Sequence, residues 1–162
     1  MPALSPGTKA PTFRLSSLDN AAYVLTDTLR SEPAVVLAFF KVSCPICQFT
    51  FPYLERLHRS YPNLPIWGIS QDDVDATESF CRMFGVTFPT LLDQGFELSV
   101  SYDLTNVPSI FLVGRDLVID RTIVGFDKEE MQGLNTDLSE LSGVPEKVLF
   151  SAADEVPALK PG

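Results

Sequence analysis

Seven consecutive apolar residues, Ala34–Phe40, run directly into the sequence Lys41-Val42-Ser43-Cys44-Pro45-Ile46-Cys47 and then into a helical pattern. An apolar run this short, preceded by Pro33, predicts a strand that is buried on both faces. From Ile46 to Leu57 apolar residues recur at three- and four-residue spacing, which predicts an amphipathic helix of about 15 residues. The fold must therefore place a buried strand directly before a helix, with two cysteines at the junction.

The rest of the chain also alternates strands with helices. The pattern predicts further strands at 22–25, 66–70, 88–92, 109–113 and 117–124, and helices at 26–29, 72–84, 97–102 and 128–141. The turn Gly114-Arg115-Asp116 joins two of the strands, so we expect this pair to be antiparallel. Together these elements indicate an α/β fold with a central mixed β-sheet flanked by helices, whose parallel part lies at the centre.

The helix ends carry their own signals. Thr26 or Asp27 is expected to cap the first short helix, and Asp72 or Asp73 the helix that Gly85 closes. The acidic cluster around Asp72 and Asp73 has no metal-ligand spacing, so we assign it to capping and solvation.

Length and composition indicate one globular domain. With 162 residues, of which 45% are hydrophobic and 20% charged, residues 1–162 can form a single core without staples. We expect the core to lie within about residues 7–142 and residues 143–162, which contain three prolines, to form an irregular C-terminal tail.

Charge and hydropathy exclude several partners. The net charge of −9 repels phosphate backbones and anionic lipids, so neither nucleic acid nor a membrane surface is expected as a partner. No apolar stretch reaches the ~20 residues of a membrane span. The opening sequence MPALSPGTKAPTF lacks the basic and apolar regions of a secretory signal, so we expect a cytoplasmic protein. We also expect a monomer.

The cysteine pair at the strand–helix junction carries most of the functional information. At the start of a helix the sulfur of Cys44 faces free backbone N–H groups and the positive end of the helix dipole, which favour the reactive thiolate. Pro45 suits the first helical position. Cys47 lies one turn further on the same face, within reach of a disulfide. We therefore expect Cys44 to be the nucleophile and Cys47 the partly buried resolving thiol.

Other assignments of the cysteines have less support. Two core cysteines before a helix would also fit the pattern. A zinc site would need His58 or Cys81 as well, and His58 lies about 16 Å from Cys47 along the helix axis, too far to share an ion. Cys81 falls in an apolar helical pattern and is expected in the core, while His58 is expected on a solvated face. We therefore expect neither a metal nor a cofactor.

Two motifs together resemble those of the thioredoxin superfamily. They are the cysteine pair between strand and helix, and Asn106-Val107-Pro108-Ser109 before a late apolar strand. The likeness is to the TlpA-like thiol-disulfide oxidoreductases and to the redoxin domains of the alkyl hydroperoxide reductase/thiol-specific antioxidant group. It extends over residues 7–142, with further matches at 7–13, Pro52 and 85–90.

The resemblance implies a thioredoxin-like fold with an N-terminal strand extension. It also implies that Pro108 follows a cis peptide bond and lies against the cysteine pair. Val107 and Pro108 would then bind substrate, with the Val107 backbone pairing with an extended substrate strand.

The sequence also departs from these families. Ser43 stands where a tryptophan is usual, Ala38 replaces the buried acid of thioredoxins, and Thr50 replaces a glutamate that TlpA-like proteins often carry. No acid–base group is therefore evident for Cys47. Lys41 can lower the pKa of a neighbouring thiol electrostatically, and it is equally compatible with a solvated lysine at a strand end.

Three functions are compatible with these features. The first is thiol-disulfide exchange between Cys44/Cys47 and protein thiol or disulfide substrates, recharged by an upstream redox partner. The second is a peroxiredoxin-like thiol peroxidase with Cys47 as the peroxidatic cysteine, although Asn106-Val107-Pro108 stands where that family has its catalytic arginine. The third is a non-enzymatic thioredoxin-fold adaptor or redox sensor. We expect exchange.

Overall fold

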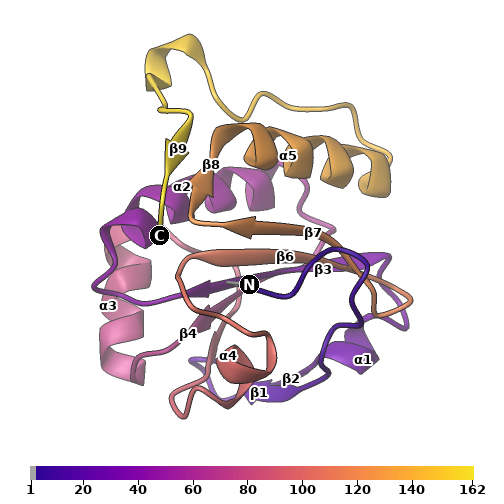
Figure 1. Cartoon of the computed structure of the whole chain (residues 1–162), viewed down its shortest axis with the longest axis vertical. Helices are drawn as coiled ribbons and strands as arrows, with labels where there is room; N and C mark the ends of the chain where they lie inside the picture. Colours follow the sequence, from indigo (N-terminus) through magenta and orange to yellow (C-terminus); the bar gives the residue numbers. More distant parts are fainter. Residues whose placement is uncertain (1–2) are drawn as a thin grey trace.

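The chain builds a five-stranded mixed sheet with helices on both faces (Figure 1). The computed structural model describes residues 3–162. The strand order is β5-β4-β3-β6-β7, in which β3 pairs parallel with β4 and β4 with β5, while β6 and β7 are antiparallel to their neighbours. The sheet strands are β3 (Ala34–Phe40), β4 (Ile66–Ser70), β5 (Thr90–Leu92), β6 (Ser109–Gly114) and β7 (Ile119–Val124).

The helices and the smaller strands complete the architecture. The helices are α1 (Leu25–Thr28), α2 (Pro45–Ser60), α3 (Val74–Phe84), α4 (Glu97–Ser101), α5 (Lys128–Ser142) and the 3-10 turn η1 (Ala152–Asp154). Two further antiparallel pairs join β1 (Arg14–Ser16) to β2 (Ala22–Val24) and β8 (Phe126–Asp127) to β9 (Leu159–Lys160). The predicted mixed α/β sheet flanked by helices is confirmed. None of the helices within 3–162 has the length and apolar character that crossing a membrane requires.

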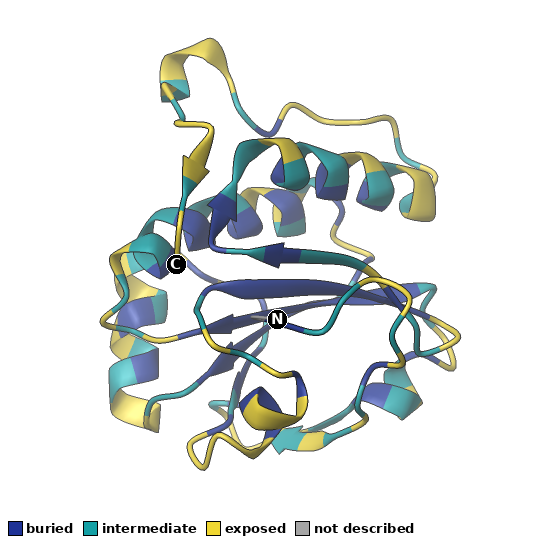
Figure 2. Cartoon of the chain, in the orientation of Figure 1, coloured by how far each residue is buried: buried dark blue, intermediate teal, exposed yellow. Residues whose placement is uncertain are grey.

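Two hydrophobic cores lie on opposite faces of β3. All seven residues of β3 are buried (Figure 2). Alternate side chains of a strand point to opposite faces of the sheet. Val36, Ala38 and Phe40 face α2, α3 and α5, whereas Val35, Leu37 and Phe39 face α1, α4 and the N-terminal arm. This burial explains the uninterrupted apolar run, and it holds the carboxyl end of β3, where the cysteine pair follows, in a fixed position.

The predicted strand arrangement and helix caps agree with the structure only in part. The parallel part includes the central strand β3 and its neighbour β4 but extends to the edge strand β5, and the other half of the sheet is antiparallel. Asp73 caps α3 by accepting the Ala76 N–H, and Gly85 ends that helix at φ +69°, as predicted. The cap predicted for α1 is wrong, because its N-cap is Val24, which provides no side-chain hydrogen bond.

Most of the C-terminal segment is irregular backbone, and it is held against the domain. After α5 ends at Gly143, residues 144–162 run back across α2 and α5, form η1, and add β9 to β8 (Figure 1). Tyr61 and Asn135 hold its start, because the Lys147 N–H donates to the Tyr61 hydroxyl at 2.9 Å and Asn135 Nδ2 donates to the Lys147 carbonyl at 2.7 Å. Leu149 then enters the core with only 2% exposure.

Candidate active site

Cys44 is the N-cap residue of α2, where β3 leads into the helix. Its backbone is extended at φ −81° and ψ 115°, and Pro45 occupies the first helical turn as predicted. The Cys47 N–H donates a hydrogen bond of 3.2 Å to Cys44 Sγ. The sulfur thus accepts a backbone N–H in the first turn of the helix. Cys44 is half-buried and thus accessible to a reaction partner.

Cys47 lies one turn further along α2 and is fully buried in the core below Cys44. Burial is the largest of the effects that raise the pKa of the Cys47 thiol well above its usual range, and the hydrogen bond with Cys44 and the charges of Cys44 and Asp72 add to it. The two thiols therefore differ sharply in environment. Cys44 is the exposed sulfur of the pair, whereas Cys47 is held as a neutral thiol behind it.

The loop before β6 forms the opposite wall of the site. The Val107–Pro108 peptide bond is cis, as the family resemblance implied. The Val107 carbonyl lies 3.5 Å from Cys44 Sγ and accepts its thiol hydrogen. Ser109 Oγ donates to the Asn106 carbonyl at 2.8 Å, and the Gly125 N–H donates to the Pro108 carbonyl at 2.8 Å, which ties this loop to β6 and β7. The structure thus places Val107 and Pro108 beside the cysteine pair.

The turn that leads from β3 to the cysteine pair begins with Lys41. Lys41 is exposed, and its carbonyl accepts the Cys44 N–H at 3.1 Å. It also lines a cavity of 260 Å³ together with Gln71 and residues 104–107. Its proposed influence on Cys44 stays a prediction.

Sequence reasoning missed the role of Asp72. Its Oδ2 accepts the Val42 N–H at 2.8 Å and so fixes the turn before Cys44. The sequence offered one signal for this role. Val42 follows β3 and Asp72 follows β4, and the carboxyl ends of neighbouring parallel strands meet at one edge of a sheet.

The departures from the family pattern have structural counterparts. Ala38 is buried in the same core as Cys47, so no titratable group lies there. The Thr50 hydroxyl is buried and donates to the Ile46 carbonyl of its own helix at 2.7 Å. Neither residue can exchange a proton with Cys47.

Cys81 and His58 lie away from the pair. Cys81 packs against the core as predicted, although it is only half-buried, and its sulfur lies 3.6 Å from Thr90 Oγ1. Burial raises the pKa of the Cys81 thiol. The solvated position predicted for His58 is wrong, because its ring packs against Phe88 and its Nδ1 is buried, with no hydrogen-bond partner among residues 3–162. The same residues contain no cluster of three or more His, Cys, Asp or Glu that could bind a metal ion.

The sheet, the Cys-x-x-Cys pair at the start of α2 and the cis-proline loop beside that pair are together the features of a thioredoxin-like domain. Comparison with known proteins agrees. The profile of the AhpC/TSA family matches residues 6–122, and the chain belongs to this family.

Individual relatives and solved structures extend this likeness. The chain is 28% identical over 131 residues to the thiol-disulfide oxidoreductase ResA of Bacillus anthracis, covering 78% of this chain and 75% of ResA. It is 25% identical over 132 residues to ResA of Bacillus subtilis, covering 80% and 73%.

Solved structures share the fold. The thioredoxin domain of a thiol-disulfide oxidoreductase from Bacteroides vulgatus superposes with a TM-score of 0.73 at 18% identity, covering 83% of this chain and 98% of that domain. A secreted disulfide oxidoreductase of Mycobacterium tuberculosis superposes with a TM-score of 0.65 at 20% identity, covering 80% and 96%.

Proposed function

We propose that this protein is a thiol-disulfide oxidoreductase in which Cys44 is the nucleophile and Cys47 the resolving thiol. The observation that carries the proposal is the asymmetry of the pair: Cys44 Sγ is accessible and accepts the N–H of Cys47, whereas Cys47 has no exposed surface. The likeness to the ResA proteins supports an enzyme that exchanges thiols and disulfides rather than a non-enzymatic adaptor.

In the reducing direction, the Cys44 thiolate attacks one sulfur of a substrate disulfide. The substrate S–S bond breaks, a mixed disulfide with Cys44 forms, and the second substrate sulfur leaves as a thiolate. Cys47 then attacks Cys44 Sγ, which forms the Cys44–Cys47 disulfide and releases the first substrate sulfur. The Cys47 proton passes to one departing substrate thiolate and the other thiolate takes its proton from water, so the substrate gains two electrons and two protons. A dithiol partner must then reduce the Cys44–Cys47 disulfide.

The environment of Cys47 determines that Cys44 reacts first and Cys47 second. Besides burial, the hydrogen bond and the charge of Cys44 raise the pKa of Cys47. Once Cys44 is bonded to substrate it no longer carries that charge, so the pKa of Cys47 falls and the resolving attack becomes easier. The protein thus presents one nucleophile before the mixed disulfide forms and a second one afterwards.

We propose protein disulfides or thiols as the substrates. The supporting observation is the Val107 backbone beside Cys44, since its carbonyl accepts no N–H from the backbone of residues 3–162 and can pair with an extended segment. The peroxidase alternative would need Cys47 to meet peroxide as a thiolate, and its complete burial and raised pKa argue against this.

The test is catalysis of insulin reduction by dithiothreitol, combined with the reduction potential of the Cys44–Cys47 couple. Catalysis that Cys44→Ser abolishes, and a two-electron couple between these cysteines, are expected. Absence of catalysis together with rapid consumption of hydrogen peroxide would overturn the proposal. The potential also separates a reductant from an oxidant, since such domains range from about −270 to −120 mV.

A further inference from the structure

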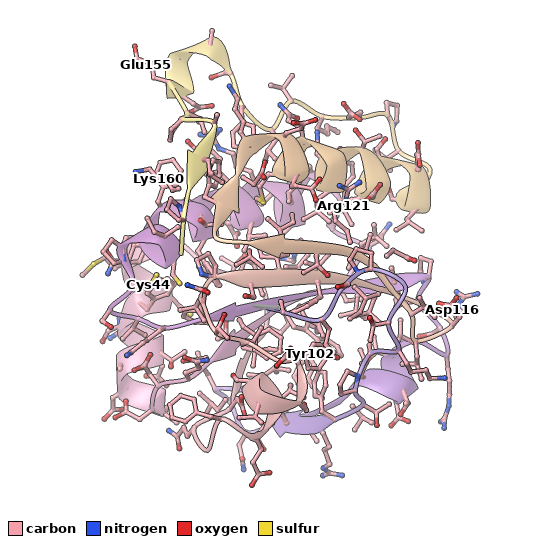
Figure 3. The ribbon with its side chains drawn as sticks, in the orientation of Figure 1. Cys44, Tyr102, Asp116, Arg121, Glu155 and Lys160 are labelled. Carbon is pink, nitrogen blue, oxygen red and sulfur yellow. The ribbon has the colours of Figure 1, made fainter. Side chains whose placement is uncertain are left out.

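The last residues of the sequence reach the active site, which the proposed function does not require. The segment 149–162, here called the strap, leaves the core at Leu149, turns at η1 and descends along β8 toward Cys44 (Figures 1 and 3). Figure 3 shows Lys160 and Cys44 on the same side of the molecule. The strap is the part of the chain that sequence reasoning assigned to an irregular tail.

The upper part of the strap is anchored on α2. Arg56 binds both carboxylate oxygens of Asp154, at 2.9 and 3.1 Å, and also donates to the Leu149 carbonyl at 3.0 Å. Arg56 lowers the pKa of the Asp154 carboxyl through this bond. Phe150 packs on Tyr53 and Phe126, with ring centroids 4.9 and 5.8 Å apart. These contacts fix where the strap begins its descent.

The lower part of the strap is held as an extended strand. Leu159 and Lys160 pair antiparallel with Asp127 and Phe126. Lys160 Nζ lies 5.1 Å from the centre of the Phe49 ring, on the first turns of α2 after Cys44. The strand β8 thus holds the backbone of the strap, and the Phe49 ring holds the Lys160 side chain.

The end of the strap occupies the space beside Val107. Asn106 Nδ2 donates to the Gly162 carbonyl at 2.9 Å. The fit is so close that a Cβ added at Gly162 would clash with the Val107 carbonyl oxygen. The same oxygen lies 3.5 Å from Cys44 Sγ. A substrate strand that pairs with Val107 while its cysteine is bonded to Cys44 therefore needs the space that Gly162 fills.

We propose that residues 159–162 occupy the extended-peptide site beside Cys44 and that a protein substrate must displace them. This inference rests on the proposed function. The surface made by Phe49, Asn106, Val107 and β8 then binds an extended segment of the substrate in place of the strap. A small disulfide needs only the sulfur of Cys44, so the strap slows protein substrates and leaves small ones almost unaffected.

A matched pair of glycine variants tests the proposal in the full-length chain. Gly125 has φ +73°, and an alanine Cβ there would lie 2.7 Å from the Lys160 carbonyl oxygen and 2.8 Å from the Gly162 nitrogen. Gly143 has φ +69° and nothing within 4 Å of such a Cβ. Both alanine variants strain a left-handed backbone position, but only Gly125→Ala pushes against the strap.

The measurement is the rate at which each reduced protein reacts with insulin and with the small disulfide 5,5′-dithiobis(2-nitrobenzoate). If the site is open for about a tenth to a third of the time, releasing the strap should raise the insulin rate about 3- to 10-fold. Because Gly125 also holds the Pro108 carbonyl, the rate with the small disulfide is the reference for any change in the active-site loop, and the effect of the strap is measured as the ratio of the insulin rate to the small-disulfide rate. Gly143→Ala should leave both rates unchanged.

A second pair covers the case in which Gly125→Ala fails to fold. Arg56→Gln removes the Asp154 anchor, whereas Arg59→Gln on the same helix removes only an ion pair to Glu55. Arg56→Gln should raise the ratio of insulin rate to small-disulfide rate, and Arg59→Gln should not. An unchanged ratio in the folded strap variants would overturn the proposal. If the wild-type protein reacted with neither disulfide, the proposed function itself would fail.

Amide hydrogen exchange provides a direct readout of displacement. Cys47→Ser can be linked through Cys44 to a short synthetic peptide that contains one cysteine, which holds the mixed disulfide. We expect the amide of Lys160, which pairs with Phe126, to exchange faster in this adduct than in the unlinked protein, because it leaves β8. Unchanged protection of the Lys160 amide in the adduct would contradict displacement.

Discussion

Replacing Tyr61 with phenylalanine should remove two hydrogen bonds that hold the start of the C-terminal segment. The protein should become less stable while the active site stays intact. Tyr61 is 1% exposed, and its hydroxyl donates to Asn135 Oδ1 at 2.8 Å and accepts the Lys147 N–H at 2.9 Å. The phenylalanine ring fills the same space without these bonds. Asn135 is itself buried, so its Oδ1 loses its partner and cannot reach water, which costs about 1–3 kcal/mol.

Lys147 lies at the surface, where water can replace the lost bond to its N–H at a cost of at most about 1 kcal/mol. The free energy of unfolding should therefore fall by about 1–4 kcal/mol. For a chain of this size that corresponds to a decrease in Tm of roughly 2–16 °C.

The measurement is chemical denaturation of the reduced protein, monitored by circular dichroism. Tyr53→Phe is the matched control, because Tyr53 lies on the same helix and its ring packs on the same segment through Phe150. This control should stay within about 0.5 kcal/mol of the wild type. A loss below about 0.5 kcal/mol in Tyr61→Phe would refute the reasoning, since the buried network would then contribute nothing to stability.

Two further predictions concern Cys47. The reduced protein should lose free energy of unfolding as the pH rises above about 9. Burial raises the pKa of Cys47 in the folded state, whereas the unfolded chain ionises this thiol near its ordinary value. The stability that the neutral Cys47 thiol contributes is therefore fully present below that pH and is lost above it. Urea denaturation between pH 7 and 10 should show this slope, and Cys47→Ala should flatten it. Asp72→Asn should lower the pKa of Cys47, because the Asp72 charge raises it, and Asp75→Asn should not. Thiol titration by NMR decides this, and an equal response of the two variants would count against a role for Asp72.

The cysteine site could be predicted because its determinants are local. A buried strand, a cysteine at the N-cap and a proline in the first helical turn are each visible in the sequence, and the structure has all three. Gly85 and Gly143 could likewise be identified as helix ends, and both adopt positive φ. The cis bond at Val107–Pro108 came from the family resemblance, since the local sequence alone favours a trans bond.

The C-terminal segment could not be predicted, because its determinants are far apart in the sequence. Its anchors are Arg56, Tyr61 and Asn135, which look like ordinary helix residues, and its own prolines indicate irregular backbone. The role of Asp72 was missed for a similar reason. Both Asp72 and Asp73 suit the N-cap of α3, and only the packing of β4 beside β3 brings the first of them to Val42.

The most direct test of the account is to trap the reaction intermediate. Cys47→Ser and Cys44→Ser are each incubated with a protein disulfide, and adducts are located by mass spectrometry. Because Cys44 is the accessible sulfur and Cys47 lies behind it, Cys47→Ser should accumulate a mixed disulfide at Cys44, and Cys44→Ser should trap almost nothing. An adduct through Cys47 or Cys81, or a sulfenic acid on Cys47 with fast peroxide consumption by Cys44→Ser, would contradict the central claim.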